Sequence, residues 1–297
     1  PNGTGLLGGS SSSQSAVVIR KPGSPNLYYV FTAAQDLEPE GINYSVVNMN
    51  LNAGNGDVTA SKNIPLLSPA TEKLTAVRHC NRKDVWVISH EYNSNRFFAW
   101  LVTSAGVSAS PVISSSGSVL SNGPIGCLKV SPDGNHLAQA HYYLGGSQFV
   151  ELFDFDNATG KVSNPVRFDY GSNCYGVEFS PNSRYLYYTA SPNASSISVN
   201  VYQADICAGT GAQIKASAQM IGSTSDGYIR TLQLGPDGKI YFSRFALTWV
   251  GVINSPNSAG AACGFTPNGV ALASGTICRA GLANFNQSYL RQTIDFS

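Results

Sequence analysis

The sequence has few charged residues. Asp, Glu, Lys and Arg make up 12% of the 297 residues, about half of the roughly 25% that is typical of soluble domains. The formal net charge is only +1 and no run of lysine or arginine occurs, so the chain lacks the basic surface that binds nucleic acid or an anionic membrane. We therefore expect no nucleic-acid partner.

Long apolar runs are also missing. No stretch approaches the roughly 18 consecutive apolar residues of a membrane span, and no charged segment followed by an apolar one stands at the amino terminus. No segment keeps the 3.6-residue apolar spacing of a helix, which excludes helical repeats. The sequence therefore predicts a chain without membrane insertion, built from short strands and turns rich in Ser, Asn, Thr and Gly.

The motifs of common metal sites and nucleophiles do not occur. The six cysteines form no CxxC pair, and there is no GxSxG elbow. A calcium-like run begins at Asp154, but Thr159 and Pro165 stand where an EF-hand loop needs Gly and Glu. We predict no catalytic residue, no metal and no cofactor. Cys263 and Cys278, in a loop-rich region, are the candidates for a disulfide if the protein is extracellular.

A recurring hairpin is the main feature that the sequence does contain. Its clearest copy runs from Asn173 to Ala190 (NCYGVEFSPNSRYLYYTA), where two apolar and aromatic segments flank the turn Ser180 to Ser183. Proline presets φ in such a turn, and Asn and Ser tolerate its remaining geometry. The corresponding turns lie 51, 49 and 55 residues apart, at Asn81, Pro132, Pro181 and Pro236.

Each hairpin is followed by two more strand-like segments, which makes a four-stranded unit. Four strands in a period near 50 residues predict an all-β fold, the β-propeller, because such units bury their faces only by stacking around an axis. Five complete blades are readable in a single domain over residues 1–297, with residues 1–15 as a loop or the remnant of a preceding blade. The predicted blades are residues 16–67, 73–114, 125–170, 174–221 and 227–273.

The segment 280–290 (AGLANFNQSYL) predicts one further strand that closes the ring. Propellers commonly close by pairing strands from both ends of the chain, which removes exposed strand edges. We therefore expect six or seven blades in the closed ring.

A few polar and aromatic residues are candidates for binding. His79 and His90, on neighbouring strands of the second unit, could meet across their hairpin, although structural hydrogen bonding explains them more simply. Arg230 and Arg244 could converge near the axis and hold an anion. Trp249 could stack on a sugar, although aromatic residues at this density more often fill the space between blades.

Several stretches resemble the amino-terminal propeller of large Bacteroidota surface proteins that the type IX secretion system exports and that carry a gliding-motility-associated sorting domain. The resemblance covers nearly the whole chain and rests on the order of GTGLLGG, RKPGSPNLYYVFT, VELFDFDNATG, YGVEFSPNSRYLYY and GLANFNQSYL. It implies a further blade-like segment before GTGLLGG, a location outside the cell or on its outer surface, and a binding or scaffold role. It implies no catalytic residue.

The expected function is that of a secreted or cell-surface interaction module that binds a protein or a glycan at one end of the ring, without enzymatic activity. The alternative from another class is a propeller hydrolase or lactonase with an axial active site, which needs at least three titratable side chains from different blades at the channel mouth. A third possibility is a purely structural subunit of a surface assembly.

Overall fold

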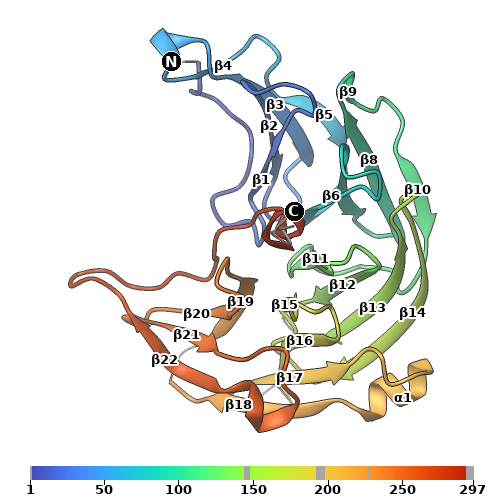
Figure 1. Ribbon diagram of the computed structural model, residues 1–297, viewed down its shortest axis with the longest axis vertical. Coiled ribbons are helices and arrows are strands. Elements are labelled where there is room, and N and C mark those ends of the chain that lie inside the picture. The colour runs from blue at the N-terminus through green and yellow to red at the C-terminus, as the bar shows by residue number, and fades with distance from the viewer. Residues whose placement is uncertain (1, 144–147, 192–197, 227, 292–297) are drawn as a thin grey trace, which may run out of the picture.

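The chain folds into five antiparallel sheets that follow one another around an axis (Figure 1). In this computed structural model the described residues are 2–143, 148–191, 198–226 and 228–291. The last three sheets pair their strands in chain order, so a hairpin joins each strand to the next, and the first two sheets follow the same order apart from one short additional strand each. The predicted all-β propeller with five readable blades is confirmed.

The first two sheets carry one short additional strand each. The first sheet consists of β1 (Ala16–Arg20), β2 (Leu27–Ala33), β3 (Ile42–Asn48) and β4 (Asp57–Val58), with β5 (Ile64–Leu67) also paired to β3. The second consists of β6 (Ala70–Arg78), β7 (Val85–Glu91), β8 (Arg96–Thr103) and β10 (Val112–Ser115), with β9 (Gly106–Val107) also paired to β8.

The other three sheets have four strands each. The third contains β11 (Leu128–Val130), β12 (His136–His141), β13 (Gln148–Asp156) and β14 (Lys161–Tyr170). The fourth contains β15 (Val177–Phe179), β16 (Tyr185–Ala190), β17 (Val199–Asp205) and β18 (Gln219–Thr224). The fifth contains β19 (Ile229–Leu234), β20 (Ile240–Arg244), β21 (Trp249–Ile253) and β22 (Phe265–Ala271).

Helices are few and lie outside the sheets. Those in the described part of the chain are α1 (Gly211–Ala216) and three short 3₁₀ turns, η1 (Asn52–Gly54), η2 (Gly260–Cys263) and η3 (Gln287–Arg291). Thr210 caps α1 by accepting a hydrogen bond from the Gln213 amide. None of the helices in the described ranges has the length and apolar character of a membrane span.

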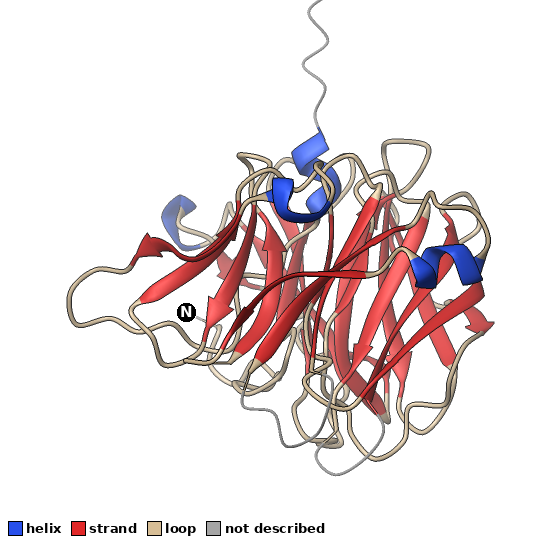
Figure 2. Ribbon diagram, turned by 90° about the horizontal axis from the view of Figure 1, so that it is seen from below, coloured by secondary structure: helices blue, strands red, loops and turns tan. Residues whose placement is uncertain are grey.

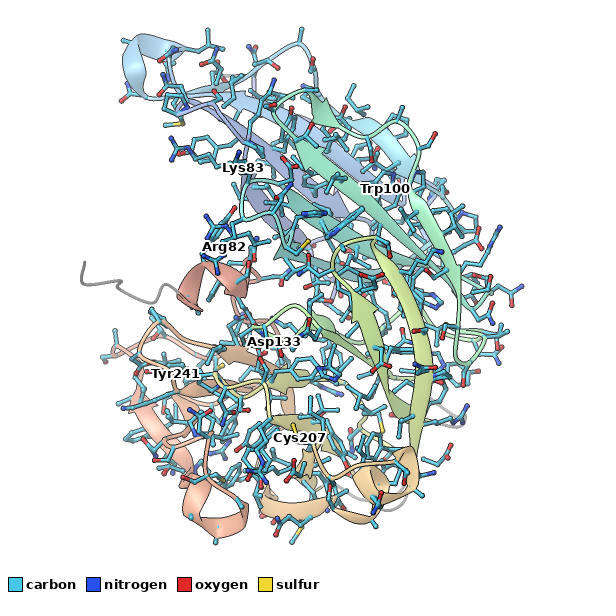
Figure 3. The ribbon with its side chains drawn as sticks, turned by 45° about the vertical axis from the view of Figure 1, so that its right-hand side comes forward. Arg82, Lys83, Trp100, Asp133, Cys207 and Tyr241 are labelled. Carbon is cyan, nitrogen blue, oxygen red and sulfur yellow. The ribbon has the colours of Figure 1, made fainter. Side chains whose placement is uncertain are left out.

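The apolar core lies between neighbouring sheets, as it must when each sheet has two faces to bury. Trp100, on β8, is 1% exposed and packs against the first sheet (Figure 3). Phe179, which the hairpin sequence presents on one face, packs between the third and fourth sheets, and Tyr187 between the fourth and fifth. These aromatic side chains therefore hold blades together.

The sheets run between two ends that carry the loops (Figure 2). At one end the chain approaches the innermost strands β1, β6, β11, β15 and β19, and we call it the Tyr175 end after a residue that precedes β15. The hairpin turns after the innermost strands lie at the other end, the Pro181 end. Arg82, Lys83 and Asp133 belong to these turns (Figure 3).

The segment 280–290 forms no strand, so the predicted closing strand is wrong. The chain leaves the fifth sheet, reaches the axis and ends the described range in η3, beside β6 (Figure 1). Its backbone bonds to side chains instead of a ladder: the Leu282 amide donates to Thr231 Oγ1, and the Thr231 hydroxyl bonds the Ala280 carbonyl. The first and fifth sheets form the two ends of an arc. Six or seven blades in a closed ring therefore remain a prediction.

Candidate binding site at the axis

Three side chains from consecutive innermost strands form a buried polar layer on the axis. Lys129 on β11 donates from Nζ to Gln233 Oε1 on β19 at 2.6 Å, and the same Nζ lies 3.7 Å from Glu178 Oε2 on β15. All three are buried. We call Lys129, Glu178 and Gln233 the axial layer; its two opposite charges compensate each other.

Glu178 is the most densely bonded member of the axial layer. Its carboxylate accepts from the amides of Phe179 at 2.8 Å and Leu234 at 2.9 Å, and from Nε2 of Gln287. Burial raises the pKa of Glu178, while Lys129 and these donors act in the opposite direction. Because Gln287 belongs to the segment that crosses the axis, the same carboxylate fixes that segment in place.

Ser13 and Gln14 close the axis above this layer, towards the Tyr175 end. The Gln14 amide bonds both backbone groups of Leu128, donating to the carbonyl at 2.9 Å and accepting from the amide at 2.7 Å. The Ser13 hydroxyl donates to Glu72 at 2.7 Å and accepts from the Gly126 amide at 3.0 Å. These hydrogen bonds close the central channel at this level. We call the closing layer, formed by Ser13 and Gln14, the floor.

A cavity of about 540 Å³ lies above this floor, at the Tyr175 end. We call it the axial cavity. Hydroxyl, amide and small side chains form most of its wall, Phe245 adds an aromatic surface that is 39% exposed, and Tyr175 and Arg279 are its titratable members. It is lined by Ser10, Ser11, Ser12, Ser13, Gln14, Ser15, Ala16, Tyr175, Phe245, Arg279, Ala280, Gly281, Leu282, Ala283 and Asn284.

Arg230 and Arg244 do not converge, so that prediction is wrong. Arg244 is 1% exposed, and its guanidinium bonds Asp226 at 2.5 Å and Asn268 at 2.7 Å, beside β22. Arg230 instead lies at the Tyr175 end among tyrosine rings, including that of Tyr175. The two arginines stand on adjacent strands, but they bond to different parts of the molecule.

His79 and His90 do not meet either. In the antiparallel register of β6 and β7, Arg78 pairs with Val85 and Ala70 pairs with Glu91, which places the two histidines at opposite ends of the hairpin. His79 stacks near Trp86, with ring centroids 5.6 Å apart, at the Pro181 end. Structural roles therefore account for both residues.

His90 is nevertheless part of a buried cluster between the second and third sheets. Burial, with the nearby Lys73 ammonium, lowers the pKa of both His90 and His141 to about 3. Burial lowers the pKa of Lys73 to about 8, and its Nζ bonds the Ile125 carbonyl at 3.0 Å. Within the described residues, no three His, Cys, Asp or Glu side chains gather as metal ligands.

Trp249 and the two cysteines have local roles. Trp249 begins β21 and is 37% exposed, outside the axial cavity. Cys263 and Cys278 are both free, so the predicted disulfide is not formed. Cys263 packs in the core between the fourth and fifth sheets, whereas Cys278 accepts a hydrogen bond from the Arg244 amide, on β20.

Sequence reasoning missed the axial layer, although a signal was present. Lys129, Glu178 and Gln233 each stand three residues before the proline of a hairpin turn, in CLKVSP, GVEFSP and TLQLGP. A polar residue that recurs at one register of an apolar innermost strand points to a shared polar position on the axis. No comparable signal marks Ser13, Gln14 or Asn284, whose segments are irregular.

Comparison with known proteins gives a likeness in fold. No family model matches the sequence, and no curated protein matches it. Among solved structures, the periplasmic gluconolactonase PpgL of Pseudomonas aeruginosa superposes with a TM-score of 0.52 at 16% identity over 76% of this chain and 64% of that one. The chain thus spans less than two thirds of the length of PpgL.

Two proteins of unknown function are also similar. One, from Desulfotomaculum acetoxidans, has a TM-score of 0.51 at 13% identity and covers 91% of this chain and 75% of that one. The other, from Bacteroides caccae, has a TM-score of 0.41 at 12% identity and covers 78% and 69%. At these identities the likeness concerns the fold alone, and the five four-stranded sheets, with the first two structures as fold neighbours, define the class of protein as the β-propeller.

Proposed function

We propose that this propeller is an interaction module whose ligand, a protein or a glycan, binds in the axial cavity. The composition of the cavity wall carries this proposal. Serine hydroxyls offer hydrogen bonds to a neutral polar ligand, and Phe245 offers a surface for stacking. Such a wall suits recognition more than proton transfer.

The same wall argues against an acid–base enzyme. Catalysis by proton transfer requires a positioned acid and base within reach of the substrate. Of the described residues that line the axial cavity, only Tyr175 and Arg279 titrate, and burial raises the pKa of Tyr175. Glu72 and Glu178 lie at or below the floor and are occupied by internal hydrogen bonds.

The proposal includes a location outside the cell or on its outer surface, as in the type IX secretion substrates that the sequence resembles. In that setting the ligand is a surface protein or an extracellular glycan. Isolation of the protein with its partners from the native cell surface, followed by mass spectrometry, tests this part. Recovery only from an intracellular fraction would contradict it.

A variant that fills the axial cavity tests the binding role. Ser11 lines the cavity and its side chain is exposed, so Ser11→Trp places a large ring inside without disturbing the core. We expect it to weaken capture of the native ligand at least tenfold, and Ser110→Trp, at an exposed site between β9 and β10, to leave capture unchanged. If Ser11→Trp captured the native ligand as well as Ser110→Trp does, the binding site would lie outside the axial cavity.

A lactonase is the second candidate, favoured by the likeness to PpgL, which is named a gluconolactonase. Hydrolysis of a panel of sugar lactones by the purified protein, lost in Ser11→Trp, would support it over the binding role. A protein that neither binds nor cleaves anything at the cavity, but forms large contacts elsewhere in a surface complex, would instead be a structural subunit.

A further inference from the structure

Arg230 is held in an aromatic cage that shares Tyr175 with the wall of the axial cavity. Its guanidinium carbon lies 4.7 Å from the ring centroid of Tyr228, 4.9 Å from that of Tyr142 and 5.3 Å from that of Tyr175. These rings come from the third, fourth and fifth blades, and Tyr175 also lines the cavity. We call Arg230 with these three tyrosines the Arg230 cage.

The guanidinium in this cage has no acceptor. Within the described ranges the Arg230 side chain makes no hydrogen bond and no ion pair, and its Nη1 is buried without a partner. The nearest carboxylate along the chain, Asp226, is bonded to Arg244. A buried N–H without an acceptor is costly, and a guanidinium is the donor group best suited to a carboxylate.

The cage orients the guanidinium in advance. Cation–π contacts with three rings hold the guanidinium in place, and its buried Nη1 still has no acceptor among the described residues. Gly176 allows the blades to approach here: a Cβ at this residue would lie 2.2 Å from the Arg230 carbonyl oxygen. The side chain is therefore positioned by the packing of β15 against β19 and needs no ligand to order it.

Another arginine, Arg279, lines the axial cavity itself. Arg279 is exposed in the wall and has no ion pair with any described carboxylate. Glu72, the acid beneath the floor, is occupied by the Ser13 hydroxyl and amide at 2.7 Å each and by the Asp36 amide at 3.1 Å. The cavity wall thus combines the uncompensated charge of Arg279 with serine hydroxyls, and a second uncompensated charge, that of Arg230, contacts its Tyr175.

We propose that the axial cavity binds an acidic sugar, a uronic acid residue of an anionic glycan, with its carboxylate on Arg230. Serine hydroxyls of the wall bond the sugar hydroxyls, Phe245 offers its ring to the sugar face, and the Arg279 guanidinium attracts the carboxylate. This assignment rests on the proposed binding role of the cavity and specifies the ligand.

Calorimetric titration with a linear trimer of galacturonic acid, and with the same trimer methyl-esterified at its carboxyls, tests the assignment. We expect the acidic trimer to bind at least tenfold more tightly than the neutral ester, with an affinity that falls as salt is raised. Arg230→Gln should weaken the acidic trimer roughly 10- to 100-fold, the range of a lost charge-assisted hydrogen bond, and leave the ester unchanged.

Two further variants control for charge and for folding. Arg230→Lys keeps the charge but loses the planar fork, so it should restore only part of the affinity. Lys215→Gln, on an exposed position of α1, removes a distant positive charge and should change nothing. Thermal melts of each variant show whether the cage also stabilises the fold. If a variant melts normally but binds more weakly, the substitution acts on binding and not on folding.

The outcomes separate this assignment from the broader role. If both trimers bind equally and Arg230→Gln leaves both unchanged, the cavity binds glycans but the acidic assignment is wrong. If inorganic phosphate or an acidic peptide competes as well as the trimer, the cage is a general anion site and the sugar assignment is wrong. If neither trimer binds and Ser11→Trp still captures the native ligand normally, the proposed binding role of the cavity itself is wrong.

Discussion

The axial layer and the Arg230 cage are two polar regions of the molecule, and they differ in how their charges are paired. In the axial layer Lys129 donates to Gln233, and Glu178 accepts from two backbone amides and Gln287. In the cage Arg230 has aromatic neighbours but no acceptor among the described residues. Both regions join residues from different blades.

This difference separates a structural role from a binding role. A buried charge that already has its partners stabilises one arrangement of the blades and has no unpaired group to offer a ligand. A preorganised donor without an acceptor is stabilised only when a ligand provides that acceptor, so the new hydrogen bond favours binding. The cost of the unpaired group is thus a reason to look for a ligand at the cage and not at the axial layer.

The largest expected effect concerns His90 and His141. Both are buried, and each is only partly paired, because one of its ring nitrogens has no partner in the described structure. Burial holds the pKa of each at about 3, below the usual value of 6.5. Between these two pKa values the histidines are protonated in the unfolded chain but neutral in the folded chain. The free energy of unfolding therefore falls as the pH falls through this window.

Each histidine should cost about 3 kcal/mol between neutral pH and about pH 4. Urea unfolding measured across this range should show a shallower acid dependence for the double variant His90→Gln, His141→Gln than for the wild type. His79→Gln, at the exposed Pro181 end, is the matched control and should keep the wild-type slope. Identical slopes for the double variant and the wild type would mean that the two rings titrate normally.

Removal of Glu178 tests the paired region directly. Glu178→Ala leaves Lys129 as a buried charge without its carboxylate and frees the Leu234 amide, which should lower the free energy of unfolding by about 3–5 kcal/mol. Chemical denaturation measures this, and Glu38→Gln, an exposed carboxyl, should have no effect. A loss below about 1 kcal/mol would contradict the structural role that we assign to the axial layer.

A methyl group at Gly176 connects the two regions. In Gly176→Ala the new Cβ meets the Arg230 carbonyl and the Leu232 side chain, so β15 and β19 must separate, at a cost of about 1–3 kcal/mol. Thermal melting and binding of the acidic trimer should both decline. Gly281→Ala, where nothing lies within 4 Å, should melt normally. Normal melting of both variants would show that the contact yields without cost.

The smallest expected effect is that of one cage ring. Tyr228→Ala removes a cation–π contact worth about 0.5–1 kcal/mol at an exposed site, which should weaken binding of the acidic trimer two- to fivefold with little change in melting. Tyr228→Phe keeps the ring and should bind like the wild type. An equal loss in both variants would assign the effect to the hydroxyl instead of the cage.

Sequence reasoning predicted the repeat well and the site poorly. The hairpin around Pro181 could be found because its determinants are local: alternating apolar residues and a turn whose Pro, Asn and Ser have fixed conformational preferences. The closing strand predicted for the segment 280–290 is wrong because an apolar stretch becomes a strand only if a neighbouring strand is free to pair with it. Here the Thr231 side chain bonds the backbone of the segment instead.

The candidate site depends on contacts that local sequence does not encode. Arg230 was identified as an anion-binding candidate, but with Arg244 as its companion, since the two lie on strands of one hairpin. In the structure Arg244 is paired with Asp226, and the companions of Arg230 are tyrosines of two other blades as well as its own. Cys263 and Cys278 are close in sequence, yet they pack in different surroundings.

The sequence by itself determined the four-stranded repeat, its period and the aromatic packing between blades, because turn chemistry and apolar alternation act over a few residues. Only the tertiary structure decided which polar side chains are paired and which are left without an acceptor. That distinction depends on contacts between residues of different blades, such as Lys129 with Glu178 and Arg230 with Tyr142. The assignment of the axial layer to stability and of the Arg230 cage to binding rests on this distinction.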